Sequence, residues 1–247
     1  MVRLIGDVVA LPGGHAEKKR CLMEGLCKMV GADMWIWSLS CQREPDKPLV
    51  YISFLKGGFT EESFVKFLEA LDHPDTVGLA ANFFQELKQK QTHLTRLRTQ
   101  MVTPEQLACS KALEAWKQAD IGPTIFSMRP LDASSSSAVG LYRHYGRPEF
   151  SPRESRIAHI ILTEIPWLHE QGWPDDRGVD VPKMSKRLRM TLNLLTLGCS
   201  QKEIATRMKI SMHTVQGYIK ETYRRFNVHS QAELMSRFYQ GNGRDQL

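Results

Sequence analysis

The chain has 247 residues, 42% of them hydrophobic, which is enough to bury a core in one large domain or two ordinary ones. No apolar run approaches the roughly 18 residues of a membrane-spanning helix, and the N-terminus lacks the long apolar segment of a signal peptide. Five cysteines at scattered positions suit neither a disulfide framework nor a zinc site. We therefore expect a globular, cytoplasmic protein without a metal ion, a cofactor or a membrane partner.

The positive charge is concentrated in the last quarter of the chain. Residues 181–247 contain 12 Lys and Arg against 4 Asp and Glu, a balance of +8, whereas the rest of the chain has a balance of −2. A compact basic segment favours binding to nucleic-acid phosphates, because each Lys or Arg that meets a phosphate releases a condensed counterion. A solvated basic surface explains the same count equally well. Charge alone therefore does not establish a nucleic-acid partner.

The first third of the chain predicts a helix, two strands and a second helix. Residues 15–30 place apolar side chains at three- and four-residue intervals, which indicates a helix that ends at Gly31. Residues 34–40 and 49–55 are rich in aromatic and β-branched residues, and prolines separate them, which favours paired antiparallel strands. Residues 60–71 begin with a capping threonine and carry acids in the first turn, as a helix should.

The middle of the chain repeats this alternation. Residues 77–87 and 104–119 have helical patterns and are joined by a polar, basic connection. Residues 124–131 and 137–145 return to strand character on either side of a serine-rich turn. Residues 151–169 open with capping-box spacing and predict a helix that a late proline kinks or ends.

Two strand pairs with helices between and after them predict an antiparallel sheet covered by helices. Residues 1–171 should therefore form an α+β, sensor-like domain. This arrangement is similar to GAF and PAS domains, which hold a small ligand between the sheet and its helices. Residues 172–183 contain glycines, prolines and acids without apolar periodicity and are predicted to be a linker. Residues 184–247 should form an all-α, four-helix domain.

Four aromatic residues of the first strand pair are candidates for binding an unidentified small molecule. They are Trp35, Trp37, Tyr51 and Phe54. Alternate residues of a strand face opposite sides of a sheet, so some of the four should belong to the ordinary core and others to an aromatic-lined pocket. One side chain can also serve both purposes.

The first two helices of the C-terminal domain are defined by their ends. Residues 186–197 space apolar side chains on one face, and Gly198 follows as a left-handed C-cap. Ser200 and Glu203 have capping-box spacing, so a short second helix should begin there. Its length of about two turns is typical of the first helix of a helix-turn-helix pair.

The third helix combines a predicted buried stripe with a polar face. Lys209 and Ile210 should form the turn before it, with Ile210 buried, and Ser211 should cap it. Its predicted core residues are Val215, Ile219, Thr222 and Phe226. A fourth helix is expected to open at Ser230, which has capping-box spacing to Glu233.

Polar and basic side chains occupy the other face of the third helix. They are His213, Thr214, Gln216, Gly217, Lys220 and Arg224. A helix in the major groove needs short polar groups near its N-terminus to meet base edges and basic groups further along to meet phosphates. Glycine in a helix interior is less favourable than alanine by about 1 kcal/mol. Close approach to DNA and simple tolerance are both explanations for Gly217.

Residues 184–239 resemble the LuxR/NarL type of DNA-binding domain. The motifs that carry the resemblance are Leu197-Gly198-x-Ser200-x-Lys202-Glu203-Ile204-Ala205, Ile210-Ser211-x-x-Thr214-Val215, Tyr223-Arg224-Arg225-Phe226-x-Val228 and Ala232-Glu233-Leu234. In that family the helix beginning near Thr214 enters the major groove, and the last helix commonly forms a two-fold dimer. The resemblance therefore implies double-stranded DNA and a second copy of the chain as partners.

The resemblance also assigns individual contacts. It implies base or phosphate contacts by Thr214, Gln216, Lys220 and Arg224, and phosphate or packing contacts by Lys202 and Arg225. One feature of the family is missing. An acidic residue is usual near the start of the first helix, but residues 185–190 are Ser-Lys-Arg-Leu-Arg-Met, so the usual salt bridge from this helix lacks its acid.

These observations predict a transcriptional regulator, not an enzyme, that binds DNA as a dimer under the control of a signal at the N-terminal domain. One alternative is a quorum-sensing receptor for a lactone. The aromatic residues of the strands loosely resemble the characteristic residues of such receptors. Another is an enzyme with an accessory nucleic-acid module. Residues 1–180 contain no Gly-rich phosphate loop, no G-x-S-x-G elbow and no metal-ligand spacing, so no catalytic residue is assigned.

Overall fold

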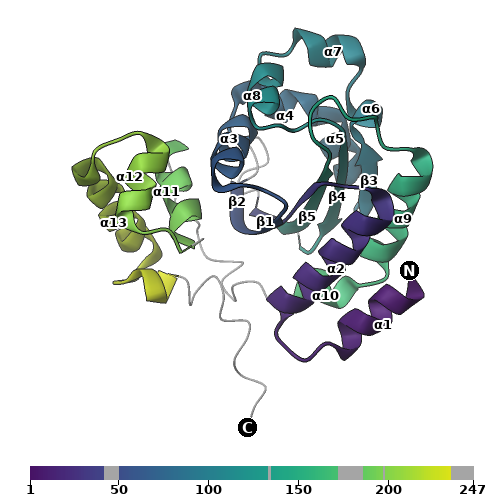
Figure 1. Cartoon of the computed structure of the whole chain (residues 1–247), viewed down its shortest axis with the longest axis horizontal. Helices are drawn as coiled ribbons and strands as arrows, with labels where there is room; N and C mark the ends of the chain where they lie inside the picture. Colours follow the sequence, from purple (N-terminus) through teal and green to yellow (C-terminus); the bar gives the residue numbers. More distant parts are fainter. Residues whose placement is uncertain (42–49, 133–134, 172–185, 197, 235–247) are drawn as a thin grey trace. The chain divides into compact units, whose positions relative to one another are not determined.

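The structure is a computed structural model that describes residues 1–41, 50–132, 135–171, 186–196 and 198–234 (Figure 1). Contacts within the chain divide it into two compact units, the N-terminal unit Met1–Gln171 and the C-terminal unit Gly172–Leu247, which we describe separately. The predicted linker over residues 172–183 lies outside the described residues, and its bounds remain a prediction. Within the described ranges, no helix is long and apolar enough to cross a membrane.

The N-terminal unit is built on a five-stranded antiparallel sheet with the order β2-β1-β5-β4-β3. The strands are β1 (Met34–Cys41), β2 (Val50–Gly57), β3 (Leu94–Leu97), β4 (Thr124–Pro130) and β5 (Ser135–Tyr142). The two predicted strand pairs are β1 with β2 and β4 with β5, and β1 also pairs with β5 along its whole length. The predicted α+β class is therefore confirmed.

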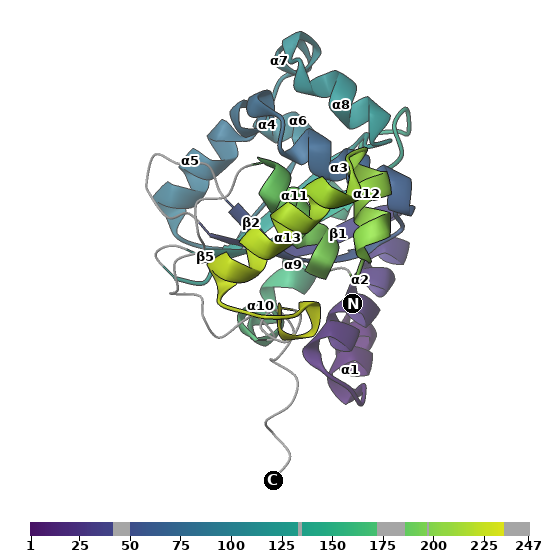
Figure 2. The same cartoon turned by 90° about the vertical axis from the view of Figure 1, so that its left-hand side faces the viewer.

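Helices cover both faces of this sheet (Figures 1 and 2). On the first face, called the α2 face, lie α2 (His15–Val30), α9 (Pro152–Thr163) and α10 (Pro166–Glu170). On the second, called the α3 face, lie α3 (Glu61–Leu71), α5 (Ala81–Lys90) and α8 (Ala112–Gln118). The rings of the first hairpin show the division: Trp37 packs against His169 of α10, whereas Phe54 packs against Phe64 of α3.

Local capping signals place several helix ends where the sequence predicts them. The Thr60 hydroxyl accepts a hydrogen bond from the Ser63 amide at the start of α3. Ser151 and Glu154 form the expected capping box at the start of α9. Gly31 adopts a φ of 63° and ends α2, a conformation that favours glycine because it has no Cβ.

Other elements differ from the prediction. The helix predicted over residues 77–87 is divided into α4 (Pro74–Leu79) and α5, and that over 104–119 into α7 (Pro104–Cys109) and α8. Between them, in the predicted connection, lie β3 and α6 (Arg98–Met101). β3 pairs with β4 at the edge of the sheet, and its four residues are too few to show a strand period in the sequence.

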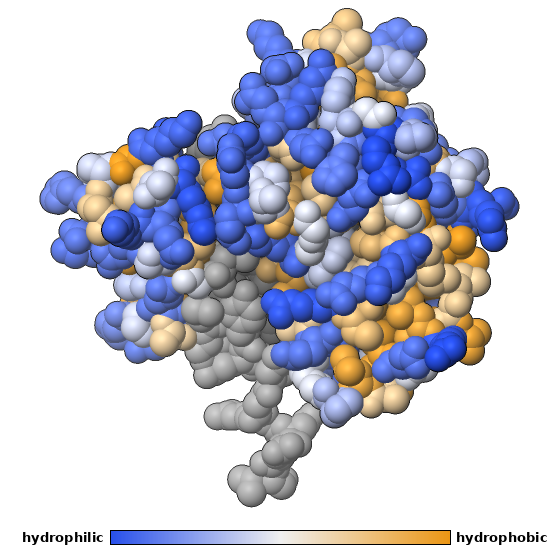
Figure 3. Space-filling model, in the orientation of Figure 1, coloured by the Kyte–Doolittle hydropathy of each residue, from blue (hydrophilic) through white to orange (hydrophobic). Residues whose placement is uncertain are grey.

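The first helix, α1 (Val2–Ala10), was not predicted. It packs against α2 so closely that a Cβ on Gly25 would lie 2.3 Å from the Leu4 side chain. Val8 of this helix is buried, whereas Val2 and Val9 remain exposed. Figure 3 shows apolar residues gathered on this part of the N-terminal unit, at the lower right of the view.

Arg143, which follows β5, joins three parts of the N-terminal unit. Only 7% of the residue is exposed, and the guanidinium lies 4.0 Å from the centre of the Phe150 ring. It donates hydrogen bonds to the carbonyls of Val30, Gly31, Pro148 and Glu149 and to the carboxylate of Glu154. The end of α2 is thereby fixed to the start of α9.

The C-terminal unit contains α11 (Lys186–Thr196), α12 (Gln201–Met208) and α13 (Met212–Phe226), followed by a helical turn over residues 231–234. Gly198 follows α11 with a φ of 82°, as predicted for a C-cap. The side-chain amide of Gln231 donates from Nε2 to the carbonyls of Leu195 and Cys199, which ties the last turn to the end of α11. The predicted helical class of this part of the chain is confirmed for its described residues.

Candidate functional site

The turn between α12 and α13 has the geometry of a helix-turn-helix. Ser200 and Glu203 form the predicted capping box at the start of α12, and Ser211 accepts a hydrogen bond from the Thr214 amide at the start of α13. Between the helices, Lys209 adopts a left-handed conformation with a φ of 53°, and the Ile210 amide donates to the Ala205 carbonyl. Ile210 is half-buried, less than predicted, because it lies in the turn instead of inside a helix.

The predicted core stripe of α13 is confirmed. Its four members, Val215, Ile219, Thr222 and Phe226, are the buried residues of the helix. The Thr222 hydroxyl donates to the Tyr218 carbonyl of its own helix, so this polar group is satisfied within the core. One side of α13 is therefore committed to packing, and the remaining side chains are available to a partner.

The residues predicted to contact DNA lie on the exposed part of the helix-turn-helix. Those exposed are Lys202, His213, Thr214, Gln216, Gly217, Lys220 and Arg224, whereas Arg225 is half-buried. The Thr214 hydroxyl lies 2.8 Å from the Ser211 hydroxyl and so belongs partly to the helix cap. Gln216, Lys220 and Arg224 follow one another at four-residue spacing and form a stripe along α13.

Glu221 is a member of this surface that the sequence analysis missed. Its Oε2 accepts from Arg224 Nε at 2.8 Å, and its Oε1 accepts from Arg224 Nη2 at 2.7 Å and from Arg225 Nε at 2.5 Å. These hydrogen bonds with the two arginines lower the pKa of Glu221 to about 2. The three- and four-residue spacing from Glu221 to the two arginines was a visible signal for this group.

Gly217 has open space where a side chain would lie. Apart from the backbone of its own helix and the two neighbouring residues, no atom in the described part of the chain lies within 4 Å of where a Cβ on this residue would be. Packing inside the protein therefore gives no reason for a glycine at this exposed helical position. Two explanations for the glycine remain. Either the helix tolerates it, or α13 approaches DNA closely at this point.

We predict that Gly217→Ala stabilises α13 by about 1 kcal/mol, because alanine loses less backbone entropy in a helix and meets no neighbour. Hydrogen exchange of the α13 amides in the full chain measures this gain. The same variant should bind DNA more weakly if the backbone approaches the groove at this point. Unchanged DNA affinity in the stabilised variant would identify Gly217 as a tolerated residue.

The sheet separates the four aromatic candidates for ligand binding. Trp35 and Trp37 lie on the α2 face, where Trp37 is fully buried and its Nε1 donates to the Ser137 hydroxyl at 2.8 Å. Phe54 lies on the α3 face. Tyr51 lies opposite Ser40 in the strand register, and its side chain is outside the described part of the chain. The described members of the set therefore cannot line one pocket together.

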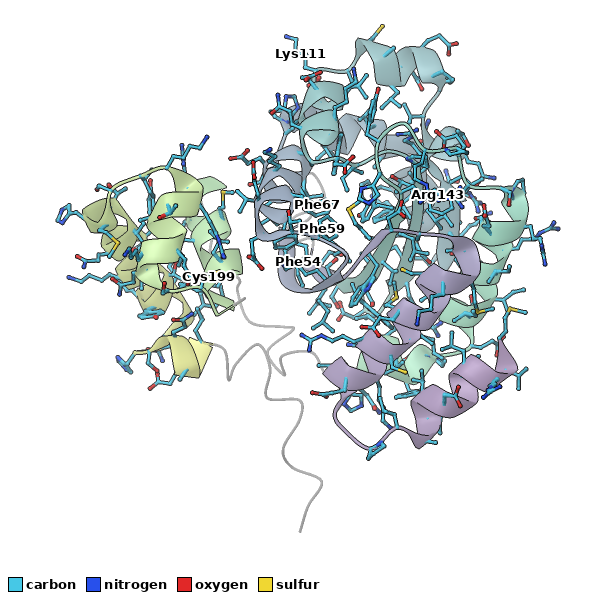
Figure 4. All side chains as sticks on the ribbon, viewed as in Figure 1. Phe54, Phe59, Phe67, Lys111, Arg143 and Cys199 are labelled. Atoms are coloured by element: carbon cyan, nitrogen blue, oxygen red, sulfur yellow. The ribbon has the colours of Figure 1, made fainter. Side chains whose placement is uncertain are left out.

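Aromatic rings from several elements meet on the α3 face. Phe59, which precedes α3, lies with its ring centre 5.7 Å from that of Phe64, 5.4 Å from that of Phe67 and 6.3 Å from that of Tyr142. Figure 4 shows Phe54, Phe59 and Phe67 close together on this side of the sheet. Only Phe54 of this group was a candidate from the sequence, because the others come from separate segments of the chain.

A network of histidines and hydroxyls occupies the α2 face. The rings of His93 and His159 have centres 5.2 Å apart, and those of His93 and His169 are 5.5 Å apart. The hydroxyls that bond to them belong to Thr95, Ser127, Ser137 and Thr163. In the described ranges, no group of three or more His, Cys, Asp or Glu residues is arranged to hold a metal ion. The network is therefore a set of mutually bonded polar groups inside the fold.

Comparison with known families identifies the C-terminal part of the chain. Residues 182–238 match the family described as bacterial regulatory proteins, luxR family. This segment is a DNA-binding domain of that family, which confirms the resemblance found in its sequence motifs. No curated protein sequence matches the chain.

The solved structures that match the chain are distant in sequence. Escherichia coli SdiA is 15% identical, covers 96% of this chain and 94% of its own, and superposes with a TM-score of 0.47. The LBD domain of VqsR from Pseudomonas aeruginosa is 13% identical, covers 68% of this chain and 90% of its own, and has a TM-score of 0.46. Vibrio cholerae VqmA is 16% identical over 87% of this chain and 84% of its own, with a TM-score of 0.25.

Proposed function

We propose that the protein is a transcriptional regulator whose C-terminal unit binds double-stranded DNA and whose N-terminal unit responds to a small molecule. The single observation that carries the proposal is the division of α13 into a buried stripe and an exposed stripe of Gln216, Lys220 and Arg224. A helix held by one side in a helix-turn-helix presents its other side to the major groove. Binding to the chromosome would place the protein in the cytoplasm.

The exposed residues of α13 suit separate roles in this proposal. Gln216 lies near the N-terminal end, where its amide can both donate to and accept from a base edge. Lys220 and Arg224 lie one and two turns further along, where cations meet phosphates. His213, Thr214 and Lys202 flank this stripe at the ends of the two helices. In this arrangement the base-reading and phosphate-binding groups follow one another along α13.

The small molecule is assigned to the α3 face of the sheet. Ligand sites are lined mainly by apolar and aromatic side chains with a few polar groups, and Phe54, Phe59 and Phe67 supply such a lining there. Lys56 adds a cation 4.3 Å from the centre of the Phe64 ring. A lactone of the quorum-sensing type is one candidate for this surface. Native mass spectrometry of the purified protein tests for the ligand, and a mass equal to the bare chain under all growth conditions would count against it.

A homodimer fits the same proposal. Two copies related by a two-fold axis would place two α13 helices on the half-sites of a pseudo-palindromic operator. Sedimentation of the protein with a selected duplex gives the stoichiometry. One chain per duplex would contradict this arrangement.

We predict that binding to a duplex weakens steeply with salt and that two substitutions act differently on it. Lys220→Ala should weaken binding to all sequences alike and reduce the dependence of log K on log salt by about 0.9, the value expected for one phosphate contact. Gln216→Ala should instead change the preferred base at one position, by about 1 to 3 kcal/mol of discrimination. Titrations of selected and random duplexes measure both effects.

Lys66→Ala, in α3 of the N-terminal unit, is the matched control, because it removes one positive charge outside the DNA-binding domain. It should leave affinity and sequence preference as in the parent chain. Affinity independent of salt would contradict the proposed function. Parental behaviour of both α13 variants would show that the recognition surface lies elsewhere.

A further inference from the structure

Glu221 is an anion on the helix that the proposed function places against DNA. Both of its carboxylate oxygens are engaged by arginines: Oε2 by Arg224, and Oε1 by Arg224 and Arg225 together. About a third of the Glu221 side chain is exposed, against 71% for Arg224 and 27% for Arg225. One acid therefore holds a strongly exposed arginine and a half-buried one.

The two arginines favour the charged form of this acid. The hydrogen bonds from Arg224, followed by the one from Arg225, lower the pKa of Glu221 to about 2. The carboxylate therefore repels nearby phosphates, and it also occupies two of the N–H groups through which Arg224 could bind one. The remaining N–H groups of Arg224 keep a fixed direction, because a fork-to-fork ion pair sets the plane of the guanidinium.

We propose that Glu221 is a specificity-determining residue, which suppresses binding to random DNA while it positions Arg224 for a single phosphate of the correct site. This inference rests on the proposed function. Random binding draws almost all its free energy from phosphate contacts, so an anion on the contact surface weakens it directly. On the correct site, the fixed Arg224 meets its phosphate with less loss of side-chain freedom, which offsets the repulsion.

A purely structural role for Glu221 has the opposite signature. Ion pairs between exposed residues at this spacing on a helix stabilise it by only about 0.3 to 0.5 kcal/mol, so α13 does not depend on Glu221 for its existence. The buried stripe of α13 holds the helix in place. Loss of a structural residue would weaken binding to every duplex. Loss of a residue that suppresses random binding should instead strengthen binding to random duplex.

The ion pairs of Glu221 lie within α13 itself. The described first helix of the domain, α11, has no acid in its sequence, whereas Arg225 meets an acid four residues earlier in its own helix. The acid that pairs with the two arginines is therefore on the DNA-facing helix, where it can affect recognition.

The test uses the full chain and four variants: Glu221→Gln, Glu221→Ala, Arg224→Gln and the double variant Glu221→Gln/Arg224→Gln. We expect Glu221→Gln to bind random duplex about fivefold more tightly than the parent near 0.1 M salt, with a slope of log K against log salt steeper by about 0.9. Its ratio of affinities for selected and random duplex should fall. The double variant should lose most of the gain. Glu221→Ala should behave like Glu221→Gln, which keeps the test valid if one of the two fails to fold.

Glu164→Gln is the matched control, because it changes the net charge by the same amount at an exposed position of the N-terminal unit. It should bind random duplex as the parent does. This inference would be overturned if both Glu221 variants kept or lowered the parental affinity for random duplex and the parental salt slope. The proposed function would remain in place. A parent chain that shows no salt-dependent binding would instead contradict the proposed function itself.

Discussion

Replacing Arg143 by methionine is expected to lower the free energy of unfolding of the N-terminal unit by about 3 to 5 kcal/mol, the range for breaking a buried ion pair from one side. Only 7% of the residue is exposed, and its guanidinium donates to four carbonyls at 2.8 to 3.1 Å and to Glu154 at 2.8 Å. Methionine fills a similar volume but donates nothing, so these acceptors lose their partner away from water.

Arg147→Met is the matched control, since Arg147 makes one ion pair with Asp33 and is 48% exposed. Its loss should cost less than about 1 kcal/mol. Tryptophan fluorescence during urea unfolding reports mainly on the N-terminal unit, because four of the five tryptophans lie in it and none lies in the matched segment 182–238. Equal destabilisation by the two variants would show that the hydrogen bonds of Arg143 are not what joins α2 to α9.

The parts of this protein that sequence reasoning predicts well are those in which the cause lies within a few residues of the effect. The capping boxes at Ser200 and Ser151 join residues three positions apart. The buried stripe of α13 follows from helical spacing alone. For the same reason the exposed DNA-facing stripe could be named in advance, since it is the remainder of that helix.

What could not be predicted depends on contacts between distant segments. Arg143 bonds to Val30, which is 113 positions away, and no local pattern indicates such a pair. The faces of Trp37 and Phe54 became clear only once the order of the strands and the helices on each face were known. Glu221 is a different case, because its spacing to the arginines was visible and its effect on them was overlooked.

Acidification is expected to destabilise the N-terminal unit well before its carboxylates are protonated. Burial, together with the nearby positive charges of His159 and Arg129, lowers the pKa of His93 from 6.5 to about 3. Burial, with His93, Arg129 and Lys19 nearby, holds the pKa of His169 well below 6.5. Both imidazoles therefore stay neutral in the folded chain at a pH where they are charged in the unfolded chain.

The hydrogen bonds of His169 fit a neutral ring, in which one nitrogen donates and the other accepts. The Leu162 carbonyl can only accept, so Nε2 donates to it at 3.0 Å, and Nδ1 accepts from the Ser137 hydroxyl at 2.8 Å. Trp37 Nε1 in turn donates to the same hydroxyl. A second proton on His169 would remove the acceptor that the Ser137 hydroxyl meets at Nδ1. Burial is the largest cause of the lowered pKa of His169, and the hydrogen bond to Leu162 partly opposes it.

The sign of the pH effect follows from proton linkage. Because the unfolded chain binds more protons below pH 6.5, stability is complete above that pH and is lost as the pH falls toward the lower folded values. A histidine that stays neutral in the folded chain costs up to about 1.4 kcal/mol of stability for each pH unit below its unfolded pKa. Urea unfolding followed by tryptophan fluorescence across this range measures the slope. His169→Gln should flatten it by one proton, whereas His213→Gln on the exposed surface of α13 should leave it unchanged. A parental slope in His169→Gln would show that the acid sensitivity arises outside this network.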